Sequence, residues 1–176
     1  MQQQIGLIHL YCGDGKGKTT AAAGQALRMA GAGGQVLFVQ FFKTGASCEV
    51  QALRQMEGVR TLHSATPHHR FSKMDEQERS QAREDYRALL SDALTQAREG
   101  VDLLVLDEAV SACNRAIISE EMLLEFLRTK PEHLEVVLTG RDPSGALLSL
   151  ADYVTEMRKI KHPYDRGVRA RRGIEF

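Results

Sequence analysis

Apolar residues occur along this chain in short continuous runs, separated by longer segments with helical spacing. The runs at 5–11, 35–42, 101–106 and 134–139 are rich in β-branched, leucine or aromatic residues and have few polar positions. Runs of this length and composition predict strands that are buried on both faces. Two shorter stretches, at 59–63 and 153–157, predict further strands.

The segments between these runs predict helices. The alanine-rich segment 19–32 favours a helix that ends at a group of glycines, and short helices are expected at 49–56 and 144–151. Asp75, with Glu78 three residues later, predicts a capping box at the start of a long helix that reaches about residue 98. A helix at 119–130 should turn four apolar residues inward, which are Met122, Leu123, Phe126 and Leu127.

Strands that alternate with helices predict an α/β fold, a three-layer sandwich around a mainly parallel sheet. The chain has 176 residues and shows no repeat or linker, so we expect a single domain over residues 1–176. The 23 basic and 23 acidic residues cancel. A net charge of zero argues against a protein whose whole surface binds nucleic acid or a membrane, and we expect neither partner.

The cysteine pattern indicates a reducing compartment. Cys12, Cys48 and Cys113 are odd in number and widely spaced, which fits neither a disulfide framework nor a zinc site. The first four residues lack the basic start of a secretory signal, and no apolar run approaches the ~20 residues that span a bilayer. We therefore expect a cytoplasmic protein.

The clearest chemical signal is the loop Gly13-Asp14-Gly15-Lys16-Gly17-Lys18-Thr19-Thr20. Its Gly-Lys-Thr ending, between a predicted strand and a predicted helix, is typical of a phosphate-binding loop, although Cys12 stands where the pattern has its first glycine. Backbone N–H groups and the helix N-terminus would surround the phosphates, Lys18 would add charge, and the Thr19 hydroxyl is suited to Mg²⁺. Lys16 is either a second phosphate contact or a solvated lysine.

Polar residues also stand where two other predicted strands end. Asp107 and Glu108 follow one strand, and there they would hold a metal ion, orient a nucleophile or cap the next helix. The sequence does not decide which of the two carboxylates would touch the metal. Arg141 follows another strand and would contact a triphosphate or form a surface salt bridge.

The basic C-terminal tail, residues 158–176, has seven Lys or Arg residues between Arg158 and Arg172 and one acid, Asp165. Such a tail would clamp polyphosphate, recognise a carboxylate- or amide-rich ligand, contact nucleic acid or be a solvated end. The apolar Ile174 and Phe176 favour an end that packs against the body of the protein. From these motifs alone, the alternatives are a P-loop ATPase or small-molecule kinase and a non-catalytic nucleotide-binding protein.

Several segments together narrow this choice. They are GDGKGKTTAA at 13–22, VLFVQFFK at 36–43, LVLDE at 104–108, EVVLTGR at 135–141, LADYVTEM at 150–157 and the closing HPYDRGVRARRGIEF at 162–176. In combination they resemble the P-loop ATP:corrinoid adenosyltransferases over nearly the whole chain. The resemblance implies a P-loop NTPase (RecA-like) fold. It also implies transfer of the 5′-deoxyadenosyl group of ATP to the cobalt of a reduced cob(I) corrinoid, with release of triphosphate.

The resemblance also assigns expected roles to individual residues. The 13–20 loop matches the family's phosphate loop, with Asp14 where many members have Asn. Glu108, beside Asp107, matches the metal-associated carboxylate, and Gln40 and Lys43 match strand-end positions near the ligands. We expect Lys18, Thr19 and Glu108 to be catalytic, with Mg²⁺ or Mn²⁺ as the cofactor.

One region departs from the family. Many members have an aromatic-rich loop with Phe and Trp that packs on the corrin, whereas here the loop at 64–74 has Phe71 as its single aromatic residue and the chain has no Trp. Phe71 would either contact the corrin or anchor the loop. The family further implies an electron-donating reductase as a partner and a homodimer.

Overall fold

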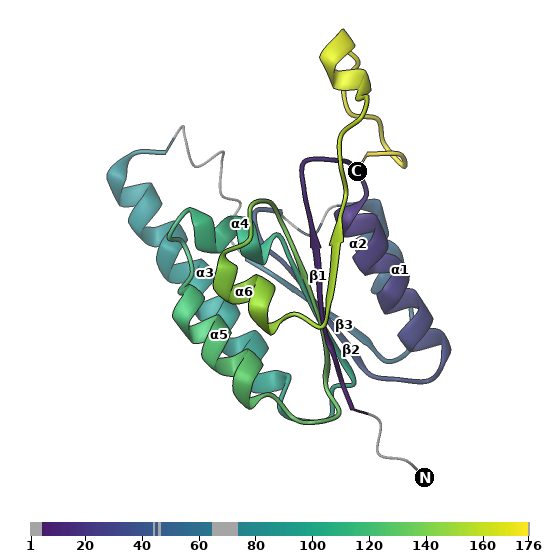
Figure 1. Ribbon diagram of the computed structural model, residues 1–176, viewed down its shortest axis with the longest axis vertical. Coiled ribbons are helices and arrows are strands. Elements are labelled where there is room, and N and C mark those ends of the chain that lie inside the picture. The colour runs from purple at the N-terminus through teal and green to yellow at the C-terminus, as the bar shows by residue number, and fades with distance from the viewer. Residues whose placement is uncertain (1–4, 44, 46, 65–73, 176) are drawn as a thin grey trace.

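A computed structural model describes residues 5–43, 45, 47–64 and 74–175. Six parallel strands form one sheet, whose edge strands are β3 and β6 (Figure 1). The strands, in the spatial order β3-β2-β4-β5-β1-β6, are β3 (Val59–His63), β2 (Val36–Gln40), β4 (Leu103–Asp107), β5 (Glu135–Thr139), β1 (Ile8–Cys12) and β6 (Tyr153–Glu156). The predicted α/β class and the mainly parallel sheet are confirmed.

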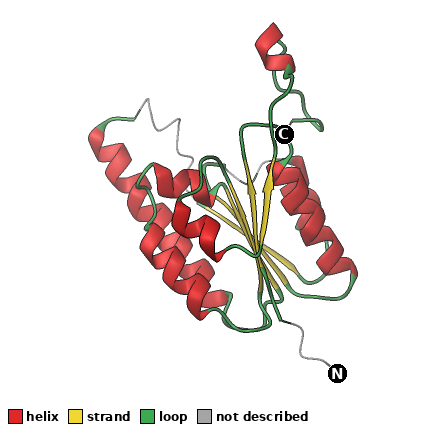
Figure 2. Ribbon diagram, in the orientation of Figure 1, coloured by secondary structure: helices red, strands yellow, loops and turns green. Residues whose placement is uncertain are grey.

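Helices cover both faces of this sheet (Figure 2). Helices α1 (Lys18–Gly31) and α2 (Cys48–Leu53) lie on one face, and α3 (Glu76–Gln96), α4 (Ala109–Asn114), α5 (Glu120–Thr129) and α6 (Gly145–Leu150) lie on the other. Successive strand residues point to opposite faces. In β2, for example, Phe38 packs into the cluster beneath α1 and α2, while Leu37 packs into the larger cluster on the opposite face. Burial on both faces explains why the strands read as continuous apolar runs.

Within the described ranges, the predicted elements are present and two short helices were not predicted. The capping box is confirmed, because Glu78 N donates to Asp75 Oδ1 at 2.8 Å and Asp75 N donates to Glu78 Oε2 at 2.9 Å. The inward orientation predicted for Met122 is wrong, because its side chain is 44% exposed. Its helix, α5, buries residues at positions 123, 126 and 127, and Met122 lies beside that stripe. The sequence pattern did not predict α4 or the 3₁₀ helix η2 (Pro163–Arg166).

The parallel arrangement brings the carboxyl ends of β1, β2, β4 and β5 to one edge of the sheet. Gln40 lies directly opposite Asp107 in the pairing of β2 with β4, and Tyr11 lies opposite Thr139 in the pairing of β1 with β5. In open α/β sheets, ligands bind at this edge. Residues far apart in the sequence therefore meet where a ligand is expected.

None of the helices in the described ranges is both long enough and apolar enough to cross a membrane.

Candidate functional site

The 13–20 loop connects β1 to α1 and opens at the ligand-binding edge of the sheet. Gly17, immediately before α1, has a φ of 116°, a left-handed conformation that glycine adopts at little cost. Helix α1 then begins at Lys18, so its first N–H groups and the positive end of its dipole point toward the loop. This arrangement favours an anion at the loop.

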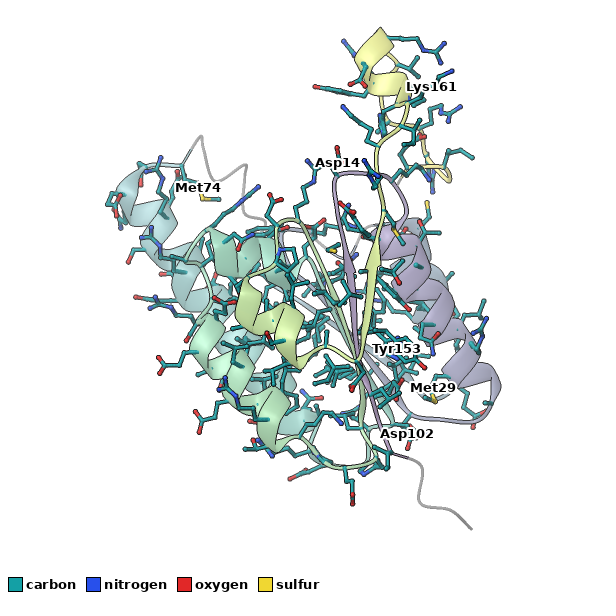
Figure 3. The ribbon with its side chains drawn as sticks, in the orientation of Figure 1. Asp14, Met29, Met74, Asp102, Tyr153 and Lys161 are labelled. Carbon is teal, nitrogen blue, oxygen red and sulfur yellow. The ribbon has the colours of Figure 1, made fainter. Side chains whose placement is uncertain are left out.

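The segment that follows β6 is hydrogen-bonded to this loop. Gly15 N donates to Met157 O at 2.6 Å, and Met157 N donates to Cys12 O at 2.8 Å. Lys159 N donates to Asp14 Oδ1 at 3.0 Å, and Figure 3 shows Asp14 beside this segment. A Cβ atom on Gly15 would lie 2.6 Å from Met157 O. The glycine at position 15 is therefore explained by the close approach of another backbone.

Replacing Gly15 with alanine should lower stability by about 1–3 kcal/mol, because the new methyl group meets backbone atoms that cannot move away cheaply. Gly24→Ala is the matched control. Gly24 lies inside α1, and its added Cβ would meet nothing within 4 Å, so this change should raise stability by about 0.5–1 kcal/mol. Urea unfolding of both variants measures the difference. Equal effects of the two changes would contradict the role of Met157 in shaping the loop.

The Lys18 amine lies under the loop. Its side chain is buried, and Nζ donates to Gly13 O at 2.7 Å and to Gly15 O at 2.8 Å. Burial, and after it the charge of Arg141, lowers the pKa of Lys18 below its ordinary value. The charge of an amine that has little water around it and carbonyl oxygens as its acceptors is strongly stabilised by a nearby anion.

Asp107 is the centre of a polar network at the strand ends. Its side chain has no exposure to solvent. Oδ1 accepts hydrogen bonds from Thr19 Oγ1 and Thr139 Oγ1, both at 2.8 Å. Oδ2 accepts from Gln40 Nε2 at 3.1 Å and from Lys43 Nζ at 3.3 Å. The carboxylate therefore joins β2, β4, β5 and α1, and both of its oxygens are already in use.

This network fixes how the Thr19 hydroxyl can act. An ionised carboxylate only accepts hydrogen bonds, so Thr19 must be the donor to Asp107. The oxygen of Thr19 keeps lone pairs for a cation. Within the described ranges, no three His, Cys, Asp or Glu residues form a ready metal cage. A Mg²⁺ ion, which commonly takes one or two protein ligands together with phosphate oxygens and waters, fits such a donor set.

Glu108 follows Asp107 in a strained conformation. Its φ of 64° is unusual for a residue other than glycine, and strain of this kind often occurs at functional sites. Glu108 N donates to Thr139 Oγ1 at 2.8 Å, and Oε2 accepts from Ser111 Oγ at 2.6 Å. The sequence motifs did not indicate Thr139 or Ser111 as site residues. Thr139 could have been found, because it is a polar residue that ends an apolar strand, as Asp107 is.

These residues surround a cleft of about 460 Å³, called the loop cleft below. Among the described residues, the charged side chains that line it are four bases and four acids, namely Lys16, Lys18, Lys43, Arg141, Asp14, Glu49, Glu108 and Glu175. Gly15, Gly17, Thr19 and Thr20 also line the cleft. Of the other residues expected at the site, Gly13, Gln40 and Asp107 are not among the lining residues, and Phe71 lies outside the described residues.

Cys12 is the last residue of β1 and is buried in the core. Burial, followed by the charge of Glu156, raises the pKa of its thiol. A neutral buried thiol is a poor nucleophile. The residue at the first position of the loop pattern therefore packs as a small apolar side chain.

Comparisons with known proteins identify the family of this chain. Residues 4–176 match the profile of the family described as ATP:corrinoid adenosyltransferase BtuR/CobO/CobP. The corrinoid adenosyltransferase CobA of Salmonella typhimurium is 33% identical over 178 residues, which cover 99% of this chain and 88% of that protein. The corrinoid adenosyltransferase of Pseudomonas aeruginosa is 31% identical over 176 residues, covering 99% and 86%.

A solved structure supports the fold independently. EssC (ATPases 2 and 3) from Geobacillus thermodenitrificans superposes with a TM-score of 0.55 at 14% identity, covering 96% of this chain and 35% of that one. At this identity the likeness shows the fold alone. The family match extends over almost all of the sequence, including the loop, the strand-end carboxylates and the C-terminal segment. The chain therefore belongs to the ATP:corrinoid adenosyltransferase family.

Proposed function

We propose that this protein transfers the 5′-deoxyadenosyl group of ATP to the cobalt of a reduced cob(I) corrinoid and releases triphosphate. The observation that carries the proposal is the loop cleft, in which the 13–20 loop, the start of α1 and four basic side chains converge, in a chain that belongs to this family. In the proposed reaction, the electron pair of cobalt(I) forms the Co–C5′ bond. The C5′–O5′ bond breaks, and its electron pair leaves on the triphosphate.

No side chain has to act as the nucleophile in this reaction. Negative charge develops on the leaving triphosphate, so the task of the protein is to position the substrates and stabilise that charge. We assign this task to Lys18, Lys16 and Arg141 together with the N-terminus of α1, all of which border the loop cleft. Lys43, held near Asp107 and Thr19, adds a further positive charge.

A Mg²⁺ or Mn²⁺ ion would neutralise part of the charge on the triphosphate when bound. We assign Thr19 and Glu108 as its protein ligands, since both border the loop cleft. Asp107 would act indirectly, by holding Thr19 in place, because its own oxygens already accept four hydrogen bonds. Gln40 would help to hold Asp107 in place, because its Nε2 donates a hydrogen bond to Asp107 Oδ2.

Family membership also supports a proposal about the remaining partners. In this proposal the protein binds the corrinoid at the same edge of the sheet, with Phe71 against the corrin ring, and works as a homodimer. A cobalt(I) centre has to be generated by reduction. A separate electron-donating reductase therefore acts on the corrinoid before the adenosyl transfer. A cytoplasmic location stays a prediction from the cysteine pattern of the sequence.

The reaction products test the proposal against its alternatives. Incubation with MgATP and chemically reduced corrinoid should yield an adenosylcorrinoid and triphosphate in equal amounts. ADP and phosphate as main products, without a cobalt–carbon bond, would indicate an ATPase or kinase. Stoichiometric capture of ligand without turnover would indicate a binding protein. A reaction without protein measures the uncatalysed background.

A further inference from the structure

The last turn of the described chain forms one wall of the loop cleft. After η2 the chain returns toward the start of α1 (Figure 1). The turn is closed by Ile174 N and Glu175 N, which donate to Arg171 O at 3.3 and 3.0 Å. Four residues of this segment line the cleft, namely Ala170, Gly173, Ile174 and Glu175.

Three N–H donors of Arg171 converge on the Glu175 carboxylate. Oε2 accepts from Arg171 N at 2.8 Å and from Nε at 3.2 Å, and Oε1 accepts from Nη2 at 3.0 Å. The Glu175 side chain is only 20% exposed, although it lies in the C-terminal segment. The hydrogen bonds from Arg171, with a smaller contribution from the charge of Lys16, hold the pKa of Glu175 at about 2. The loop cleft therefore contains an ionised carboxylate of the protein itself.

This donor set suits a phosphate at least as well as a carboxylate. Arginine binds both groups through paired N–H donors, and backbone N–H groups commonly contact phosphate oxygens. A bound triphosphate brings several negative charges into the same cleft, so Glu175 would be repelled from it. A phosphate oxygen could then take the position that the carboxylate leaves.

We propose that Arg171 forms a further phosphate subsite for the triphosphate, and that Glu175 fills this subsite in the free protein. The inference rests on the proposed function, because it requires triphosphate in the loop cleft. The simpler alternative is that the pair only clasps the last turn, as an i,i+4 ion pair on the surface does.

Substitutions of the two partners distinguish these possibilities by the sign of their effect. Glu175→Gln removes the competing charge and keeps the size of the side chain, so triphosphate should bind about fivefold more tightly. Arg171→Gln removes the subsite, so binding should weaken by about threefold, since the loss is offset in part by the release of Glu175. If the ion pair only stabilised the last turn, both substitutions would loosen the same wall of the loop cleft. Neither substitution would then make triphosphate bind more tightly.

The double variant excludes a general effect of charge. Once Glu175 is replaced, all of the Arg171 donors are available to the triphosphate. Replacing Arg171 in that background should therefore weaken triphosphate binding about tenfold. Triphosphate should then bind the double variant more weakly than the wild-type protein. If the two single effects were simply additive, the double variant would bind somewhat more tightly than wild type.

The experiment is calorimetric titration of the full chain with inorganic triphosphate in the presence of Mg²⁺, at one fixed salt concentration. Asp165→Asn is the matched control. It removes one acid from the same segment, where Asp165 pairs with Lys159 outside the loop cleft. Its dissociation constant should stay within about twofold of wild type. Thermal unfolding of each variant shows whether the fold is retained.

Each outcome decides the inference. Tighter binding by Glu175→Gln, together with a double variant that binds more weakly than wild type, supports the subsite. Unchanged or weaker binding by Glu175→Gln, or additive effects, overturns it and leaves the phosphate loop intact. If the wild-type protein binds no triphosphate, the proposed function fails first and the subsite fails with it.

Discussion

Replacing Lys18 with alanine should lower kcat/KM for ATP by at least about 100-fold, which is about 2.7 kcal/mol of transition-state stabilisation. The amine is buried beneath the 13–20 loop, with two carbonyl oxygens as its hydrogen-bond acceptors. In the proposed reaction its charge meets the developing charge of the triphosphate in a site with little water, where such a pair is strongest. Lys18→Arg should fail to restore activity, because the larger guanidinium does not fit under the loop.

The measurement is steady-state formation of adenosylcorrinoid from ATP and preformed cobalt(I) corrinoid. Lys161→Ala is the control, since it removes a lysine from the exposed C-terminal segment, away from the loop cleft (Figure 3). It should change kcat/KM by less than about twofold. A Lys18→Ala variant that remains folded and keeps activity within the same limit would rule out the 13–20 loop as the phosphate site.

Replacing Asp107 with alanine should lower the free energy of unfolding by about 3 kcal/mol and abolish activity. The carboxylate is fully buried and is the acceptor for four side chains. Its removal leaves the Gln40 amide and the Thr139 hydroxyl without a hydrogen-bond acceptor in the interior. Burying these two groups then costs free energy that no hydrogen bond offsets. Thr19 loses the partner that orients its hydroxyl, so metal binding should weaken as well.

Urea denaturation gives the stability change, and Asp92→Ala is its control. Asp92 is exposed on α3 and accepts a hydrogen bond from Gln96 Nε2 at 3.0 Å. Its loss should change stability by no more than about 0.5 kcal/mol. The isosteric Asp107→Asn should also destabilise, because the neutral side chain loses the charge that pairs with Lys43 and its amide nitrogen cannot accept the hydrogen bonds that a carboxylate oxygen accepts. Wild-type stability in Asp107→Ala would mean that the network does not support the strand ends.

The fold was largely predictable because the strands are buried on both faces. Five-residue strands such as β2 and β4 have no exposed position, so their sequences, VLFVQ and LLVLD, stand out against the helices. The missed helix α4 has only six residues and follows Glu108 directly, with no capping side chain to mark its start. Helix η2 is shorter still and buries no residue, so it leaves no apolar periodicity to detect.

The site was predictable in part. Lys18, Thr19 and Asp107 are marked by a motif or by a polar residue at the end of an apolar strand. The sequence could not indicate that both Asp107 oxygens are already engaged, because their donors come from β2, β5, α1 and the loop after β2. Likewise, Gly15 reads as a flexible loop residue, whereas its position is set by Met157, 142 residues later in the sequence.

The position of β1 between β5 and β6 has a consequence for how this protein is made. Ile8 pairs with Val136 and His9 with Tyr153, so the first strand emerges from the ribosome long before either neighbour exists. Met157, which holds the 13–20 loop, is synthesised later still. Closing such distant contacts is slow. We therefore expect a nascent chain to remain unable to retain nucleotide until nearly all of it has been translated.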